Sequence, residues 1–462
     1  MSRILVLGGG VCGLAAGLLL ARDGHQVRLL ERDPAPAPDA AEAAWSDWER
    51  RGVPHFRQAH GLHPPARHIL EAELPDVAAA LLADGARIGD PLDQLPPGIA
   101  DRERRPGDDR FRALHVRRPV FEGALARAAD AQPGLVVRRG VTVTGLVTRG
   151  LNGSAHVAGV ETADGRVYTA DLVVDAMGRG SRLPDLLGRA GVASGPDELV
   201  GSRFLYYTRY FRGEEPALRA PRLTAVGSFS ILTLPADNGT WAVTLFGAAD
   251  DRPLKRLRDP DAFTAVVRAC PRHAHWLEGR PITGVLPMAG VTDRRRPAAA
   301  PVAGLLSVAD AWACTNPTMG RGITMGLMHV RLLRDVVRAH GGEPRVLAAA
   351  WTERTEETLG PWFGASLEND RARLAEMEAC REGRVPEPPA DPAAKLRAAL
   401  GPAMARDADA FRAGLEIIGC LATPQEVFAR PGLAGRVLAL AAEAGPPPPP
   451  GPDRERLLQL VG

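Results

Sequence analysis

A glycine-rich turn near the N-terminus constrains the fold of this chain more than any other feature. The apolar residues 4–7 predict a short buried strand, and residues 14–20 predict a helix that begins directly after the turn. Residues 27–31 predict a second strand after that helix. Strand, glycine turn, helix and strand in this order form a βαβ unit of the kind that binds dinucleotides.

Each glycine in the turn has a physical role. Gly8 permits the tight turn, Gly10 lets the backbone approach a pyrophosphate, and Gly13 lets the helix lie close to its strand. The helix N-terminus then presents unpaired N–H groups and partial positive charge to the phosphates. Glu31 follows roughly 20 residues later, which is the spacing of a carboxylate that binds a ribose. Because a carboxylate repels a 2′-phosphate, the turn predicts FAD or NAD rather than NADP at this site.

Composition and charge describe an ordinary soluble protein. The 462 residues carry a net charge of +2, and the arginines alternate with acidic residues, which argues against nucleic-acid binding. The five cysteines are odd in number and form no C-x-x-C pair, so we expect a reducing cytoplasm and neither a disulfide framework nor a structural zinc site. No apolar run reaches the roughly 18 residues of a membrane span, so we expect no integral membrane segment.

Four histidines lie between residues 55 and 68, in a loop that is rich in aromatic and basic side chains. Pro64 and Pro65 break any helix that would align these histidines, and no cysteine or acidic pair completes a ligand set. We therefore expect no metal site. The composition of the loop is typical of a segment that touches a ligand.

The segment 203–246 has the pattern of an antiparallel sheet, with aromatic residues on one face of its first strand. This face predicts either the wall of an apolar substrate pocket or ordinary core packing. The pocket candidates are Tyr206 and Tyr210 on the strand and His60 in the preceding loop.

Two later segments have the pattern of a chain that returns to a nucleotide bound by the first βαβ unit. A buried strand at 172–174 leads into Asp175 and a glycine-rich turn. A further strand ends near Asp310 and is followed by a loop and by a helix that starts after Gly320. Asp310 has the position of an acceptor for a ribityl chain, and the helix start suits the negative charge of a reduced flavin.

Together these three segments resemble the FAD-dependent monooxygenase superfamily, which includes the flavoprotein aromatic hydroxylases and related epoxidases, over about residues 1–340. The run Asp175-Ala176-Met177-Gly178-Arg179-Gly180-Ser181-Arg182 is similar to the D-A-x-G-R-x-S turn of the epoxidase-like branch. Ala309-Asp310 stands where the family usually has Gly-Asp.

The resemblance implies where a flavin lies. Arg118 and the loop with Arg57 and Gln58 are expected near it, Asp310 at the ribityl and pyrophosphate region, and residues 317–323 along the isoalloxazine. The expected cofactor contacts are Gly8, Gly10, Gly13, Glu31, Arg32, Arg57, Gln58, Arg118, Asp310, Pro317, Gly320, Gly322 and Ile323.

The resemblance also implies a reaction. NADPH or NADH reduces FAD, O₂ adds at flavin C4a, and the hydroperoxide hydroxylates or epoxidises an apolar or aromatic small molecule, as in secondary metabolism. The protein excludes water, orients the substrate and stabilises anionic reduced flavin, so no metal or catalytic triad is expected. The turn after Asp175 lacks the Asp-Gly motif of the phenol hydroxylases. Reduction by a separate flavin reductase therefore stays open beside direct reduction.

Proteins with this fold also have other functions, and one of them, halogenation, lacks its characteristic residues in this sequence. Halogenases need a lysine between flavin and substrate and a W-x-W-x-I-P segment; Lys255 and Lys395 lie outside that region, and Trp45 and Trp48 lack the Ile-Pro. Halogenation is therefore not expected. Reduction of a prenyl or polyene double bond, a non-catalytic FAD-binding redox protein and an NAD dehydrogenase remain as alternatives.

The expected fold is α/β, a Rossmann-like FAD-binding domain with an inserted antiparallel substrate domain and a C-terminal helical region. Residues 1–190 and 286–345 form the two parts of the FAD-binding domain in this interpretation. Residues 191–285 form the substrate domain, and residues 346–462 form the helical region, with five prolines at 446–450 as a stiff linker.

Overall fold

The computed structural model describes residues 1–151, 154–201, 203–289, 292–296, 301–445 and 448–462. Its centre is a parallel sheet with the strand order β18-β9-β1-β2-β5. The strands are β1 (Arg3–Leu7), β2 (Gln26–Glu31), β5 (Leu135–Arg139), β9 (Leu172–Asp175) and β18 (Leu305–Ser307). The predicted βαβ unit is confirmed, because α1 (Val11–Arg22) connects β1 to the adjacent parallel strand β2.

Helices cover one face of this sheet, and a β-ribbon with a short helix covers the other. Ile4 and Val6 of β1 share a core with α1, α5 (Arg118–Ala131) and α8 (Gly322–His340). The alternate residues Leu5 and Leu7 pack with the three-stranded ribbon and α6. The ribbon consists of β6 (Val143–Leu151), β7 (Ser154–Thr162) and β8 (Val167–Thr169), and α6 spans Leu183–Arg189. Burial on both faces explains why β1 is an unbroken apolar run.

The second sheet is antiparallel, with the order β12-β13-β14-β11-β15 and with β16 also paired to β11. Its strands are β11 (Phe204–Arg212), β12 (Leu223–Val226), β13 (Phe229–Pro235), β14 (Thr240–Ala248), β15 (Arg280–Pro281) and β16 (Leu286–Ala289). Tyr207 and Phe211 face the core with α7 (Pro260–Arg268) and α14 (Arg454–Val461). Phe204 and Tyr206 face Met377 of the long helix α9 (Pro344–Arg381) on the opposite side. The predicted division of aromatics between two faces is confirmed.

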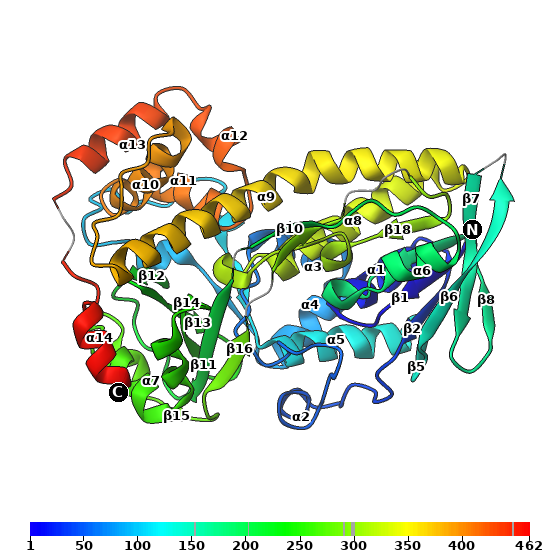
Figure 1. Ribbon diagram of the computed structural model, residues 1–462, viewed down its shortest axis with the longest axis horizontal. Coiled ribbons are helices and arrows are strands. Elements are labelled where there is room, and N and C mark those ends of the chain that lie inside the picture. The colour runs from blue at the N-terminus through cyan, green and yellow to red at the C-terminus, as the bar shows by residue number, and fades with distance from the viewer. Residues whose placement is uncertain (152–153, 202, 290–291, 297–300, 446–447) are drawn as a thin grey trace.

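Figure 1 shows α9, in yellow to orange, running along the molecule from the parallel sheet toward the antiparallel sheet. The helices α10 (Pro392–Met404), α11 (Ala408–Ile418), α12 (Pro424–Phe428) and α13 (Leu433–Ala442) gather at its far end. The C-terminal third is therefore helical, as predicted. Pro446 and Pro447 of the expected linker lie outside the described residues. Within the described ranges, no helix has the length and apolarity needed to cross a membrane.

The remaining elements are short. They are α2 (Ala41–Ser46), α3 (Pro64–Glu73), α4 (Pro75–Ala83), β3 (Arg87–Gly89), β4 (Ala113–His115), β10 (Glu198–Val200), β17 (Asp293–Arg295) and β19 (Ala313–Cys314). Three single 3₁₀ turns carry residues of the candidate site: η3 (Gly178–Gly180), η6 (Ala309–Ala311) and η7 (Pro317–Met319).

Candidate cofactor and active site

Three segments that are far apart in sequence end at one edge of the parallel sheet. Leu7 and Ser307 are the register partners of Asp175 on the two sides of β9. The Ala176 N–H donates to the carbonyl of Leu7 at 2.9 Å, and the Val308 N–H donates to the carbonyl of Asp175 at 2.9 Å. The carboxyl ends of parallel strands are where open α/β sheets bind ligands. The glycine turn, the turn after Asp175 and the loop after β18 therefore share one candidate site.

The glycines of the first turn divide into two kinds. A Cβ on Gly13 would lie 1.9 Å from the carbonyl oxygen of Gly8, and a Cβ on Gly8, whose φ is +102°, would lie 2.6 Å from that of Ala176. These two glycines are required by the packing of the fold. A Cβ on Gly10 would meet no atom within 4 Å. Gly10 is the N-cap of α1, so it faces open space where the helix N-terminus can hold a pyrophosphate.

The carboxylate of Glu31 is already oriented by three hydrogen bonds. It accepts from the Gly9 N–H at 2.6 Å, from the Asp33 N–H at 2.8 Å and from Arg50 at 3.0 Å. A carboxylate offers about four acceptor positions. One position therefore remains for a ribose hydroxyl, and the adenosine end of FAD fits the residue that the spacing predicts.

Arg50 is a site residue that the sequence interpretation missed. Its guanidinium, which is 4% exposed, pairs with Glu31, with Asp33 at 3.1 Å and with Glu122 at 2.5 Å. It also donates twice to the Gly9 carbonyl at 3.1 Å. Arg50 thus fixes the glycine turn to β2 and α5. In the sequence it is one of many arginines in a polar loop, and no spacing rule singles it out.

Asp310 lies in η6 among basic side chains. Burial raises the pKa of its carboxyl, and the positive charges of Arg118, Arg179 and Arg294 oppose that shift. These three arginines come from α5, η3 and β17. The result is a carboxylate among basic side chains at the same sheet edge as the glycine turn, which suits an acceptor for ribityl hydroxyls next to a pyrophosphate.

Ala309, directly before Asp310, has a left-handed backbone with φ of 53°. The left-handed conformation costs an alanine roughly 1–2 kcal/mol, whereas glycine adopts it freely. We expect Ala309→Gly to raise the free energy of unfolding by about 0.5–1 kcal/mol, measured by urea denaturation. The control is Ala311→Gly, which removes a buried methyl group at a residue without positive φ and is expected to lower it by about 1 kcal/mol. Destabilisation by Ala309→Gly would contradict the prediction.

The His60 ring is neutral, and its two nitrogens bind the Gln58 carbonyl and the Arg118 guanidinium. Its Nδ1–H donates to the carbonyl of Gln58 at 2.8 Å, so Nε2 accepts from Arg118 at 3.2 Å. Burial, followed by the charge of Arg118, lowers the pKa of His60 to about 3. A neutral His60 therefore positions Arg118 at the candidate site, and both of its ring nitrogens are occupied.

Arg57 and Gln58, expected beside the flavin, use their side chains to hold the loop itself. Arg57 donates to the carbonyls of Trp45 at 2.8 Å and of Ser46 and Trp48 at 3.1 Å. The Gln58 side-chain amide donates to the carbonyl of Leu286 at 3.1 Å. Both side chains thus hold the loop to carbonyls at the end of α2 and on β16, and their contact with a flavin stays a prediction. Arg32 is exposed, and its guanidinium lies next to Gly52.

The loop of Pro317 to Gly320 leads into α8. Gly320 is left-handed, with φ of 64°, and the His63 ring binds the Met319 carbonyl at 3.0 Å. A Cβ on Gly322, the first residue of α8, would meet no atom within 4 Å. The N-terminus of α8 is therefore open to a ligand. Ile323, expected along the isoalloxazine, is 7% exposed and belongs to the core of α8.

Tyr210 and Tyr206, the pocket candidates on β11, have different surroundings. Tyr210 packs edge-on against Trp45 with ring centroids 4.7 Å apart, and its hydroxyl donates to the Gln58 carbonyl at 3.1 Å. Tyr210 therefore supports the loop. The Tyr206 hydroxyl is buried and has no hydrogen-bond partner among the described residues.

Asp370 of α9 is a second buried group here that the sequence interpretation missed. Its Oδ1 accepts from the Thr318 hydroxyl, and its Oδ2 makes no hydrogen bond within normal geometry to the described residues. Burial raises the pKa of Asp370 to about 7; Asp293 adds to this shift, while Thr318, Asn369 and Arg321 oppose it. The charges of Asp370 and Asp293 also raise the pKa of Tyr206, after burial. α9 thus brings an acid to the loop of η7.

The raised pKa of Asp370 predicts a pH dependence of stability. An unfolded aspartate titrates near about 3.9, so between about pH 4 and pH 7 the native protein binds the extra proton and stability falls as the pH rises. We expect Asp370→Asn to flatten this fall, measured by thermal unfolding from about pH 4.5 to 8. Glu378→Gln, at an exposed position of the same helix, should keep the wild-type slope. Equal slopes in both variants would show that Asp370 does not titrate in this range.

Comparisons with known proteins agree with this geometry. Residues 6–72 match the model of an NAD(P)-binding Rossmann-like domain. "Protein Rv3254" of Mycobacterium tuberculosis is 28% identical over 386 residues, 77% of each chain. "FAD-dependent monooxygenase fsr3" of Gibberella fujikuroi is 27% identical over 242 residues, 52% of this chain and 42% of that protein. The structure of PqsL, a probable FAD-dependent monooxygenase from Pseudomonas aeruginosa, shares the fold with a TM-score of 0.58 and 14% identity, over 82% of this chain and 96% of that one.

Proposed function

The chain belongs to the FAD-dependent monooxygenase superfamily, and we propose that it uses FAD to insert one oxygen atom of O₂ into an apolar or aromatic small molecule, by hydroxylation or epoxidation. The observation that carries this proposal is the meeting of the open Gly10 turn and the Asp310 loop at the same sheet edge. FAD needs both, since its pyrophosphate lies in the middle of one extended molecule and its ribityl chain and flavin ring lie on one side of it.

The residues present fit FAD along its length. Glu31 keeps an acceptor position for the adenosine ribose, and the N-terminus of α1 at Gly10 would hold the pyrophosphate. Asp310 would accept from the ribityl chain, and the start of α8 at Gly322 would stabilise negative charge on the flavin ring. When bound, reduced FAD supplies the electrons that activate O₂.

The protein contributes orientation and exclusion of water. The aromatic face of β11 lies under α9, and the side chains of Phe204, Phe246 and Met377 bury it. The Tyr206 hydroxyl and Oδ2 of Asp370 are buried here without a hydrogen-bond partner among the described residues, and we propose that they orient the substrate. A closed, dry site limits unproductive release of hydrogen peroxide.

The reductant is proposed to be NADPH or NADH, acting directly or through a separate flavin reductase. At the end of β9, Asp175 accepts from the Met177 N–H at 3.0 Å and from the Ser181 hydroxyl at 2.5 Å, so it holds the turn that replaces the Asp-Gly motif. All five cysteines have free thiols, which suits the cytoplasmic location we propose.

The deciding experiment follows NADPH and NADH oxidation by the FAD-loaded protein with candidate aromatics and polyenes, while oxygen and hydrogen peroxide are measured. A monooxygenase consumes O₂ in proportion to oxygenated product. Product formation without oxygen would instead identify a reductase of double bonds. A protein that takes up no FAD in excess cofactor would overturn the proposal.

A further inference from the structure

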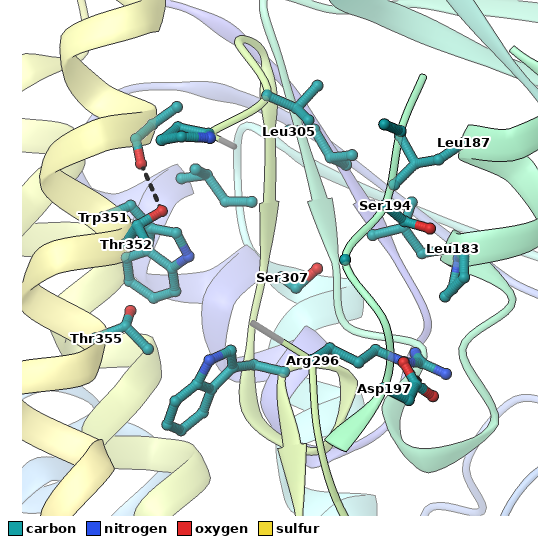
Figure 2. A pocket seen from close by; sticks show the side chains of 18 of the residues that line it. Leu183, Leu187, Ser194, Asp197, Arg296, Leu305, Ser307, Trp351, Thr352 and Thr355 are labelled. Carbon is teal, nitrogen blue, oxygen red and sulfur yellow. Dashed lines mark hydrogen bonds and ion pairs between the residues drawn. The ribbon is translucent and has the colours of Figure 1, made fainter. Parts of the chain in front are cut away.

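A cavity of about 120 Å³ lies beside the edge strand β18, outside the candidate cofactor site. Figure 2 shows its lining, with Leu187 of α6 and Leu305 of β18 on one side and Trp351 and Thr355 of α9 on the other. Trp312, from the loop after β18, completes the wall. Three elements from different parts of the chain thus enclose a space that none of the expected functions uses.

The lining favours an uncharged ligand with one ring. Two indole side chains and several leucines supply apolar surface, and hydroxyls of serine and threonine supply polar contacts. The charged groups of the lining are paired: Arg296 donates to Asp197 at 3.2 Å and to the Ser181 carbonyl at 3.1 Å, and Glu356 pairs with Arg295 at 2.9 Å. An apolar cavity of roughly 150 Å³ holds a benzene molecule. The space here is of similar size and therefore suits a ligand with a single six-membered ring.

A hydrogen-bond relay connects this cavity to the loop that carries Asp310. The Ala309 N–H donates to Nδ1 of His329 at 2.9 Å, so the neutral ring carries its proton on Nε2. That Nε2–H donates to the Thr355 hydroxyl oxygen at 3.0 Å. Burial lowers the pKa of His329 to about 3, so the ring stays neutral near pH 7.

Aromatic side chains pack around His329, and among the described residues the Thr355 hydroxyl hydrogen at the end of the relay is free to donate. The His329 ring stacks on Trp351 with centroids 4.4 Å apart, and Trp312 meets it edge-on at 5.4 Å. Thr355 accepts from His329, and its own hydroxyl hydrogen has no acceptor among the residues that the structure describes. Because Thr355 lines the cavity, that hydrogen is available to an acceptor atom inside it.

We propose that this cavity is a regulatory site for a small uncharged aromatic molecule with a hydrogen-bond acceptor. The ligand accepts from Thr355, fills the cavity that both tryptophans line and, through His329 and Ala309, biases the Asp310 loop. Binding in the cavity stands independently. Its effect on FAD rests on the proposed function, since it requires Asp310 to contact the cofactor.

The test compares two probes, benzyl alcohol and toluene, which differ in the acceptor oxygen. Calorimetry of the full chain should show benzyl alcohol binding about fivefold more tightly than toluene. Thr355→Val should remove that difference, whereas Thr355→Ser, which keeps the hydroxyl, should retain it. Leu187→Trp or, on β18, Ser307→Leu should weaken both probes at least about tenfold by filling the cavity. Wild-type affinity in a folded filling variant would overturn the site.

The second arm measures coupling to the cofactor. Saturating benzyl alcohol should change the FAD dissociation constant at least about threefold in the wild type and in Thr355→Ser, but not in Thr355→Val. An unchanged FAD affinity in the wild type would overturn the regulatory role. A protein that binds the probes but no FAD would sink the proposed monooxygenase function while leaving the cavity established as a binding site.

Discussion

Gly10→Val is expected to yield a folded protein that has lost its flavin. A Cβ at this position meets no atom within 4 Å, and Gly10 already has the extended backbone, φ −81° and ψ −177°, that valine favours. The added methyl groups would occupy the space in front of α1 where the pyrophosphate approaches. We expect FAD affinity to fall at least about 100-fold, equivalent to about 3 kcal/mol, with an unchanged melting temperature of the apoprotein.

Two other glycines make this prediction specific. Gly13→Ala places a Cβ 1.9 Å from the Gly8 carbonyl oxygen, so it should destabilise the fold itself. Gly188→Ala, in α6 with open space around it, should raise stability by up to about 1 kcal/mol and leave flavin content unchanged. Flavin absorbance and thermal unfolding of the three purified variants distinguish these outcomes. Retention of wild-type flavin content by Gly10→Val would falsify the placement of the pyrophosphate.

Arg50→Met is expected to cause the largest loss of stability among single substitutions at the site. It removes the cation that Glu31, Asp33 and Glu122 share and leaves three carboxylates close together, two of them largely buried and one fully buried. Loss of one partner from a buried ion pair costs about 3–5 kcal/mol. We expect a decrease of at least that size in the free energy of unfolding at pH 7, measured by urea denaturation.

The pH dependence identifies the cause of that loss. Without Arg50, repulsion among the three negative charges destabilises the folded state, and acid weakens that repulsion, so the deficit should be smaller at pH 5 than at pH 7. Arg51→Met, a substitution at the exposed neighbouring position, should change stability by less than about 0.5 kcal/mol at both pH values. Similar losses in the two variants would contradict the role of Arg50.

The position of α9 changes the interpretation of the C-terminal third. Its sequence reads as a helical region with no motif of its own. In the structure its residue Met377 covers the aromatic face of β11, and its Asp370 reaches Thr318 in η7. The same helix carries Thr355, whose hydroxyl reaches His329. Substitutions along α9 are therefore expected to affect the substrate region and the candidate cofactor site together.

Local patterns were sufficient wherever one strand, turn or helix decides the outcome. The spacing of Gly8, Gly10 and Gly13 determined the βαβ unit, because backbone sterics at a tight turn depend on the residues of the turn alone. The strand leading to Asp310 and the helix after Gly320 were likewise readable from apolar periodicity. The assignments of Arg118 and of residues 317–323 to the flavin stay predictions.

Tertiary structure alone decided which polar side chains are free for a ligand. Arg57 and Gln58 have the composition of ligand contacts, and folding also brings them backbone carbonyls to which they donate. Arg50, His329 and Asp370 carry no sequence signal, because their roles depend on burial and on partners 17 to 72 residues away. A sequence states which groups a chain possesses; only packing fixes which of them lose water, which find a partner, and which remain to bind something else.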